Sequence, residues 1–522
     1  MRRFAALLAA AVSALAIPVL TAAPANAHAV LVASSPIDGA HLDTPPSEVT
    51  LTFDEIVRPV PGAAQVISAT GARADDGSAH LTADGTTIVI PLRPDLPRGS
   101  YAATYRVVSA DTHVVSGSIS FGVGQDAGTP PVTYPDHSRP LTVASNVARG
   151  LLYVGLVLCA GVAFTSRILW SWALGLVRIR ALVAGGWVLL GVATVAQVLL
   201  QGPQSLNVGW SGVFSAGAMS DTLASRSGAV LIARVVVIAV LGVAIRGSGR
   251  WWTYVVGICS AGVALTIAIN GHAGVGELVL LATVVTAAHV MAMTVWLGGL
   301  LVLCVAVLPS RSTENLRRWS LVAFACVSVL IVSGEYQAWR QVRPVEAMWS
   351  TGYGITLSLK LAIVTAMLTL AYVGRRRLDP RTLRRTVPAE MALGLAVVIV
   401  TAALVSQAPA RETYGPAVTL SAPLDGRSAR IEIGSTRHGP TSIAVTVTDS
   451  EHRPVHAQAV SGTLSSEEAG IAALKVTFTP GAGDHWLSSY TVVPLAGSWT
   501  LNLSVEFSTS DAVVTSTHFR VW

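Results

Sequence analysis

Two patterns of hydrophobic and polar positions divide the chain into three parts. Apolar and polar residues alternate in short runs from about 28 to 125 and again from 412 to 522, as in VTLTFDEIV and SWTLNLSVEF. Alternation with a period of two predicts half-buried β-strands. Many short strands separated by turn residues predict a β-sandwich of immunoglobulin-like size in each of these parts.

Long apolar runs replace the alternation between residues 145 and 408. Each is about 20 residues long, which is the length that a helix needs to cross a bilayer. The eight runs lie near 147–166, 181–201, 228–246, 251–270, 278–308, 319–338, 354–374 and 388–407. The sequence therefore predicts a mixed fold, with an eight-helix transmembrane bundle between two β-sandwiches and a Pro- and Gly-rich linker at 126–144.

The first 27 residues have the layout of a secretory signal peptide. Arg2 and Arg3 precede an apolar run that ends in the small residues Ala25-Asn26-Ala27, as at a cleavage site. The alternative is an ordinary first transmembrane helix. Cleavage after Ala27 makes His28 the first residue of the mature chain.

Arginines between the apolar runs predict how the helices are oriented. The connectors expected in the cytoplasm contain Arg167, Arg178, Arg180, Arg246, Arg250, Arg311, Arg317, Arg318 and the run RRRLDPRTLRR. The opposite connectors contain only Arg226, Arg340 and Arg343. Because positive residues are retained in the cytoplasm, we expect a multi-pass plasma-membrane protein whose mature termini are both extracytoplasmic.

Composition agrees with a membrane protein and limits its partners. Hydrophobic residues make up 52% of the chain and charged residues 12%, so we expect a lipid bilayer and no nucleic acid as a partner. The two lysines, Lys360 and Lys475, each follow a leucine, so the Gly-Lys of a phosphate-binding loop is absent and no ATP is expected. The four cysteines all lie in apolar stretches, which predicts no disulfide in the β domains. The oligomeric state does not follow from the sequence.

A free His28 would offer two nitrogens, its α-amine and its imidazole. Asp111 and His113 lie two residues apart in a predicted strand, so their side chains are expected on one face. Alone, such a pair is more often an exposed strand edge. Combined with His28, it gives three nitrogens and one oxygen, a donor set that suits tetragonal Cu(II) better than Zn(II) or Mg(II).

The stretches HAVLVASSPIDGA, VTLTFDEIV and VVSADTHVVSGSISFGV resemble the CopC copper-binding proteins over about residues 28–125. In that family the mature amino terminus, its histidine, and the Asp and His of a D-x-H motif hold Cu(II). The resemblance places these roles on His28, Asp111 and His113. Some members also hold Cu(I) in a methionine-rich loop, but residues 28–125 contain no methionine.

Residues 145–408 resemble the CopD copper-resistance membrane proteins, most clearly in AAHVMAMTVWLGGLLVL and RRWSLVAFACVSVLIVSGEYQAW. Residues 412–522, particularly PLAGSWTLNLSVEF, look like the YtkA-like β domains of some CopC-CopD fusions. Such fusions are associated with copper uptake, so the resemblance implies copper transport and resistance and no enzyme activity. The alternatives are a membrane redox protein, with haem- or copper-dependent electron transfer, and a copper sensor anchored by the helices.

The helical part contains a candidate path for copper. His289 is the only histidine well inside a predicted helix, Met293 follows four residues later on the same face, and Met291 is close in sequence. Imidazole and thioether groups suit Cu(I), although methionine in an apolar helix usually serves packing. His272, in the connector between the fourth and fifth helices, is a candidate for receiving metal at the entrance.

Three charged residues form a candidate intramembrane group. Arg234 and Lys360 each lie about two helical turns from the predicted outer surface, where a charge is costly. Glu335, at the outer end of the sixth helix, would lower that cost by pairing with them. A structural ion pair or snorkelling side chains are favoured over a gating role.

Overall fold

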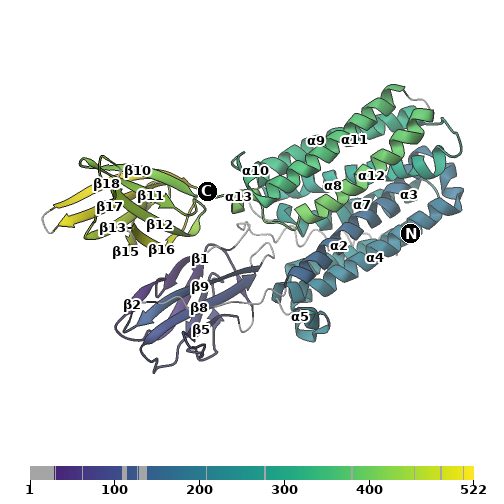
Figure 1. Ribbon diagram of the computed structural model, residues 1–522. Coiled ribbons are helices and arrows are strands. Elements are labelled where there is room, and N and C mark those ends of the chain that lie inside the picture. The colour runs from purple at the N-terminus through teal and green to yellow at the C-terminus, as the bar shows by residue number, and fades with distance from the viewer. Residues whose placement is uncertain are drawn as a thin grey trace. The chain divides into compact units, whose positions relative to one another are not determined.

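The computed structural model describes residues 29, 31–60, 63–108, 114–125, 127, 138–206, 209–274, 278–377, 380–451, 453–481, 485–508 and 511–522. These residues form a helical part and two β domains, each with its own hydrophobic core (Figure 1). The mixed fold predicted from the hydrophobic pattern is confirmed.

The N-terminal β domain consists of two facing sheets. One has the order β1-β3-β7-β6, formed by β1 (Leu31–Ser35), β3 (Glu48–Phe53), β7 (Thr87–Pro91) and β6 (His80–Leu81). The other has the order β2-β9-β8-β4, formed by β2 (Ala40–Leu42), β9 (Val114–Val123), β8 (Gly99–Val108) and β4 (Arg58–Pro59), and β5 (Gln65–Ser68) also pairs with β8. Alternate residues of β3 and β7 are fully buried, so the period of two in the sequence directs one face of each strand into the core.

The helical part contains eight helices that are long and apolar enough to cross a membrane, as predicted. Their spans are Pro140–Leu169, Val177–Gln204, Arg226–Ala244, Arg250–Ile269, Val279–Val307, Leu316–Gln341, Gly352–Val373 and Arg384–Leu404. The first is built from α2 (Ser138–Leu156), the π-helical turn η1 (Val157–Gly161) and α3 (Val162–Leu169). The fifth combines α8 (Val279–Val302) with the π-helical turn η5 (Leu303–Val307).

The remaining spans lie in α4 (Val177–Leu206), α6 (Arg226–Ala244), α7 (Arg250–Ile269), α9 (Leu316–Gln341), α11 (Gly352–Arg377) and α12 (Pro380–Leu404). Shorter helices occupy the connectors: η2 (Ser171–Gly175), η3 (Trp210–Phe214), α5 (Ala216–Ala224), η4 (His272–Gly274), α10 (Ala347–Ser350) and α13 (Ala410–Thr413). All four cysteines are free, in agreement with the sequence.

Two glycines explain why α8 can lie at the centre of the bundle, against α3, α7, α9 and α12. A Cβ on Gly298 would collide with the backbone of Gly161, and a Cβ on Gly299 would collide with the ring of Trp319. Small residues allow helix backbones to approach closely in membranes. The Trp-Leu-Gly-Gly stretch is therefore the point where the first, fifth and sixth spans meet.

Replacing Gly298 with valine is expected to destabilise the bundle strongly. Overpacking costs about 1–3 kcal/mol when side chains can adjust, and here the collision is with backbone, which cannot. We expect a large fall in the melting temperature of the purified protein and loss of monodispersity in size-exclusion chromatography. Gly185→Val is the matched control, because no atom lies within 4 Å of a Cβ at that position; equal losses in both variants would contradict the close contact.

Two arginines cap the ends of helices, and both lie in connectors that are expected in the cytoplasm. Arg167 Nη2 donates to the carbonyl oxygens of Ala244, Ile245 and Gly247, at and just past the end of α6, at 3.3, 2.9 and 3.1 Å. Arg384 Nη2 donates to Leu308 O at 3.2 Å, where η5 ends. Cationic side chains stabilise the exposed carbonyls of helix C-termini, so these arginines also serve local structure.

The C-terminal β domain likewise has two antiparallel sheets around a core with the buried Trp499. The first is β10-β11-β12-β16-β15, formed by β10 (Val418–Leu424), β11 (Arg427–Ile433), β12 (Gly439–Thr448), β16 (His485–Val493) and β15 (Thr479–Pro480). The second is β14-β13-β17-β18, formed by β14 (Ile471–Thr477), β13 (Ala459–Ser466), β17 (Gly497–Ser508) and β18 (Asp511–Val521).

Candidate functional site

The three predicted Cu(II) ligands, His28, Asp111 and His113, lie outside the described residues. The strands that lead to them are described. Ala29 is 3% exposed and belongs to the core of the N-terminal β domain, and β8 ends and β9 begins on either side of residues 109–113.

Contacts within and between the two sheets place the start of β1 and the end of β8 at one end of the sandwich. Leu31, at the start of β1, pairs with Phe53 at the end of β3. The Phe53 ring packs edge-on against Tyr105 with 5.2 Å between ring centroids, and Tyr105 is three residues before the end of β8 at Val108. The start of β1 and the end of β8, which lead to the predicted ligands, therefore lie at the same end of this domain.

Two further residues at this end were missed from the sequence. Glu55 is 6% exposed, and it continues the inward phase of Val49, Leu51 and Phe53, which is the signal that could have identified it. A carboxylate oxygen is a donor that metal ions accept as a ligand, so Glu55 is a second oxygen donor to consider there. Burial raises the pKa of Tyr105 to about 12, so its phenol stays neutral at this end of the domain.

His289 is held by a hydrogen bond that fixes its tautomer. Its Nδ1 lies 2.8 Å from Ser333 Oγ on α9, and the Ser333 hydroxyl donates to the carbonyl oxygen of Val329. Because a hydroxyl has one proton, Ser333 accepts from His289, so Nδ1 carries the ring hydrogen. Nε2 is then left with the lone pair that a metal ligand needs.

The neighbours of His289 differ in their roles. Met291 and Met293 are half-buried and pack against the core of the bundle, as methionines in apolar helices usually do. Lys360 on α11 is close enough for its charge to act on the His289 ring. His272 begins η4, and its side chain lies outside the described residues.

The predicted charge group is not found as an assembly. Arg234 donates to Thr266 and Gln197, because α6 packs against α4 and α7. Glu335 on α9 is exposed, and within the described part of the chain no ion pair joins it to Arg234 or Lys360.

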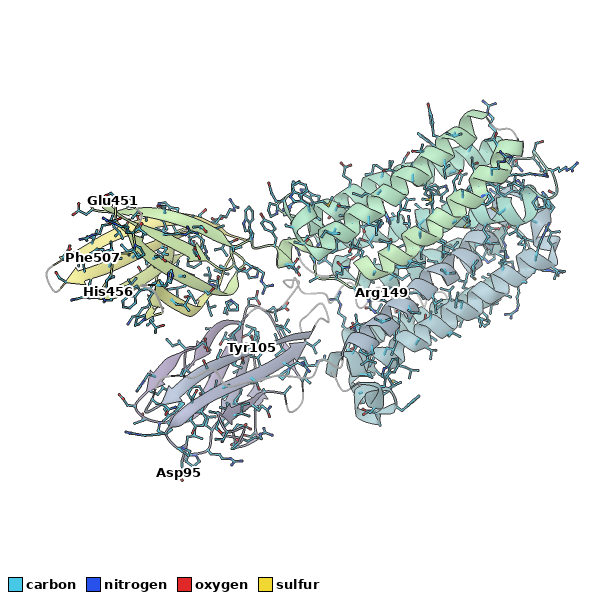
Figure 2. The ribbon with its side chains drawn as sticks, viewed as in Figure 1. Asp95, Tyr105, Arg149, Glu451, His456 and Phe507 are labelled. Carbon is cyan, nitrogen blue, oxygen red and sulfur yellow. The ribbon has the colours of Figure 1, made fainter. Side chains whose placement is uncertain are left out.

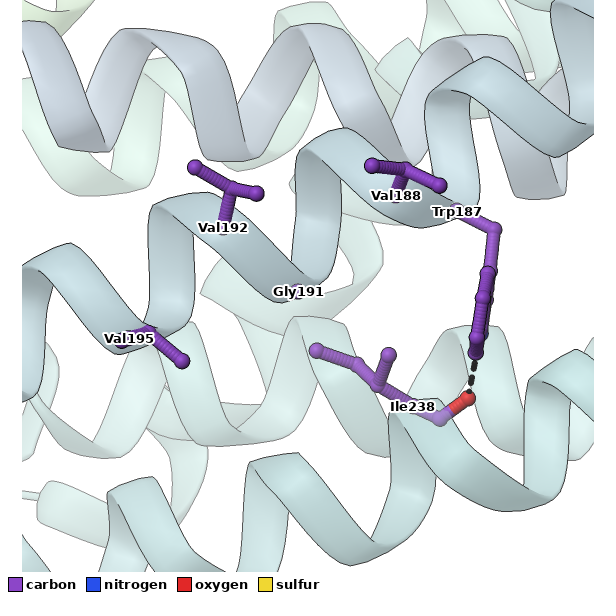
Figure 3. Close-up of a pocket in the computed structure, with 6 residues that line it drawn as sticks. All are labelled: Trp187, Val188, Gly191, Val192, Val195 and Ile238. Carbon is purple, nitrogen blue, oxygen red and sulfur yellow. Dashed lines mark hydrogen bonds between the residues drawn. The ribbon is translucent and has the colours of Figure 1, made fainter.

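Between α4 and α6 lies an apolar groove that offers no ligand to a metal ion (Figure 3). The Trp187 Nε1–H already donates to Ile238 O at 2.9 Å. The lining side chains are Trp187, Val188, Val192, Val195 and Ile238, with Gly191 between them. On two membrane-spanning helices, such a surface suits lipid.

Histidines of the C-terminal domain are dispersed where they are described. His485 on β16 bonds Thr446 Oγ1, and His518 on β18 bonds Thr500 Oγ1, at 2.6 and 2.8 Å, on strands of different sheets. His438 bonds Trp522 O at the chain end. Across the described ranges, no group of three or more His, Cys, Asp or Glu side chains is arranged to hold a metal.

Comparison with known proteins follows the same division of the chain. Residues 31–124 match the CopC domain family, and residues 313–404, which contain α9, α11 and α12, match the family of copper resistance protein D. The C-terminal likeness to YtkA stays a prediction.

Related proteins cover both the whole chain and its first domain. The copper transport protein CutJ of Bacillus subtilis is 29% identical over 482 residues, which are 87% of this chain and 88% of CutJ. Copper resistance protein C of Xanthomonas campestris pv. juglandis is 36% identical over 110 residues, 20% of this chain and 86% of that protein. The crystal structure of CopC from Methylosinus trichosporium OB3b has 32% identity, covers 18% of this chain and 93% of its own, and gives a TM-score of 0.17.

Proposed function

Because the chain joins a CopC domain and a CopD domain in one polypeptide homologous to CutJ over 87% of its length, we propose that it captures Cu(II) outside the cell membrane and imports copper. The eight apolar spans make it a multi-pass membrane protein. The proposed orientation has both mature termini outside, with most connector arginines in the cytoplasm.

Capture is assigned to the first residue of the mature chain and the segment between β8 and β9. His28 would bind through its α-amine and imidazole, His113 through a second imidazole, and Asp111 through an oxygen. The observation that carries this assignment is the convergence of β1 and β8 on one end of the sandwich through Leu31, Phe53 and Tyr105. Copper is the cargo here, and the donor set favours the cupric ion.

Passage through the membrane is assigned to the face of α8 that carries His289. The hydrogen bond from His289 to Ser333 supports this role, because it leaves Nε2 unprotonated and oriented by a second residue. Met293 lies one turn away on the same helix and would offer a thioether. An imidazole with a thioether suits Cu(I).

Whole-cell copper content tests the proposal and its direction. In cells grown in low copper, His113→Ala is expected to lower accumulated copper several-fold relative to the wild type, measured by mass spectrometry at equal membrane abundance. His80→Ala is the matched control, because His80 is an exposed histidine of the same domain on β6. Higher copper in His113→Ala cells would indicate export, and unchanged copper would contradict the assigned site.

A further inference from the structure

Arg234 is buried in the helical bundle, and none of the ion pairs between described side chains includes it. It is 1% exposed, and its guanidinium donates to Thr266 Oγ1 at 2.9 Å, Thr266 O at 3.1 Å and Gln197 Oε1 at 2.7 Å. All three acceptors are neutral. They satisfy the hydrogen-bonding groups of Arg234 and leave its positive charge uncompensated, which is costly at membrane depth.

A second arginine acts electrostatically on this group. Arg149 on α2 (Figure 2) is within electrostatic range of Arg234, and the Tyr153 phenol is within range of both guanidinium groups. Arg149 Nη1 is buried and has no hydrogen-bond partner among the described residues. Ala148 of α2 and Leu200 of α4 share one apolar cluster, which puts Arg149 at the level of the α4 residues that face Arg234.

Gln197 contributes another donor without a partner. Its amide orientation is fixed, because Oε1 accepts from Arg234. Its Nε2 is therefore left buried and without a hydrogen-bond partner in the described part of the chain. Arg149 Nη1 and Gln197 Nε2 are hydrogen donors, so each needs an acceptor. Asn146 Oδ1 on α2 is a buried acceptor that also lacks a partner among the described residues, but it is neutral and cannot balance a positive charge.

The sequence supplies no carboxylate for this position from the surrounding helices. Asp221 is the only acidic residue between 138 and 269, and it belongs to the short connector helix α5. The helices α2, α4, α6 and α7 thus bring together two guanidinium groups and two unpartnered donors but contribute no acid of their own. A negative charge from outside these helices would complete the group.

We propose that Arg149, Arg234 and Gln197 bind a small inorganic monoanion, of the size of chloride, inside the helical bundle. Arg234 is eight residues from the start of its span at Arg226, a depth of about 12 Å at 1.5 Å per residue. A lipid phosphate at the headgroup level does not extend that far into the hydrocarbon, so a free ion is favoured. This assignment is independent of the copper sites.

Equilibrium binding of radioactive chloride to the purified full-length protein tests the assignment. We expect about one saturable chloride per chain in the wild type, and a melting temperature that is higher in sodium chloride than in sodium gluconate at equal ionic strength. Arg149→Gln should lose the chloride binding and the chloride-dependent rise. Arg250→Gln, at an exposed arginine that bonds Tyr254, should keep both.

Gln197→Glu gives the decisive result, because it places a carboxylate where the anion is expected. This variant should bind no chloride, yet melt in gluconate at or above the temperature of the wild type in chloride. The proposal is overturned if the wild type binds no saturable chloride, or if Arg250→Gln loses as much binding as Arg149→Gln. A lipid retained by the wild type and lost in Arg149→Gln, detected by mass spectrometry, would also overturn it in favour of a lipid phosphate.

Discussion

Extending the mature chain by one residue ahead of His28 is expected to weaken its Cu(II) affinity by more than about 100-fold. The extension converts the α-amine into an amide, so the chelate ring between amine and imidazole cannot form. Loss of residues that only orient metal ligands typically costs about 10–100-fold, and here a ligand itself is removed. The measurement is a competition titration of the purified protein, with the cupric signal followed by electron paramagnetic resonance.

The control for this extension is His41→Ala. His41 lies on β2 in the same domain, with its side chain about half exposed, and its removal should leave the affinity within about twofold. Amino-terminal sequencing of the exported protein comes first, because a mature chain that starts at any residue other than His28 removes the basis of the site. Equal affinity with and without the added residue would move the Cu(II) site elsewhere.

The features that could be predicted from the sequence are those that depend on the local periodicity of hydrophobic residues. The eight spans follow from apolar runs of bilayer length, and the strands follow from alternation, so both appear where the pattern placed them. Glu55, two residues after the end of β3, continues the inward phase of that strand, so the alternation also predicts a buried acid near the candidate site.

Contacts between distant segments could not be predicted in this way. The partners of Arg234 are 37 and 32 residues away, on α4 and α7, and no spacing rule selects them over Glu335. The closeness of Gly298 to Gly161 likewise depends on which helices are neighbours. Hydropathy determines whether a segment crosses the membrane, whereas packing against other helices determines which residues its side chains contact.

Replacing His289 with leucine is expected to abolish copper accumulation that depends on this protein, while leaving the protein folded. Leucine preserves an apolar side chain inside α8 and removes the imidazole nitrogen that would bind copper. Ser333→Ala keeps the imidazole and removes its hydrogen-bond partner, which frees the ring to rotate and to change tautomer. Since residues that orient a ligand contribute about 10–100-fold, Ser333→Ala should retain a reduced rate, measured as initial copper uptake at equal membrane abundance.

The order of these effects separates a copper path from simple packing. If His289 binds copper through Nε2, uptake should fall most in His289→Leu, less in Ser333→Ala, and little in Met291→Leu, which conserves volume at a half-buried site. If His289 serves packing alone, His289→Leu should transport at nearly the wild-type rate, and any loss should follow the melting temperatures of the three variants. Loss of copper uptake in Ser333→Ala together with normal uptake in His289→Leu would contradict the proposed copper path. In that path Ser333 acts only by orienting His289.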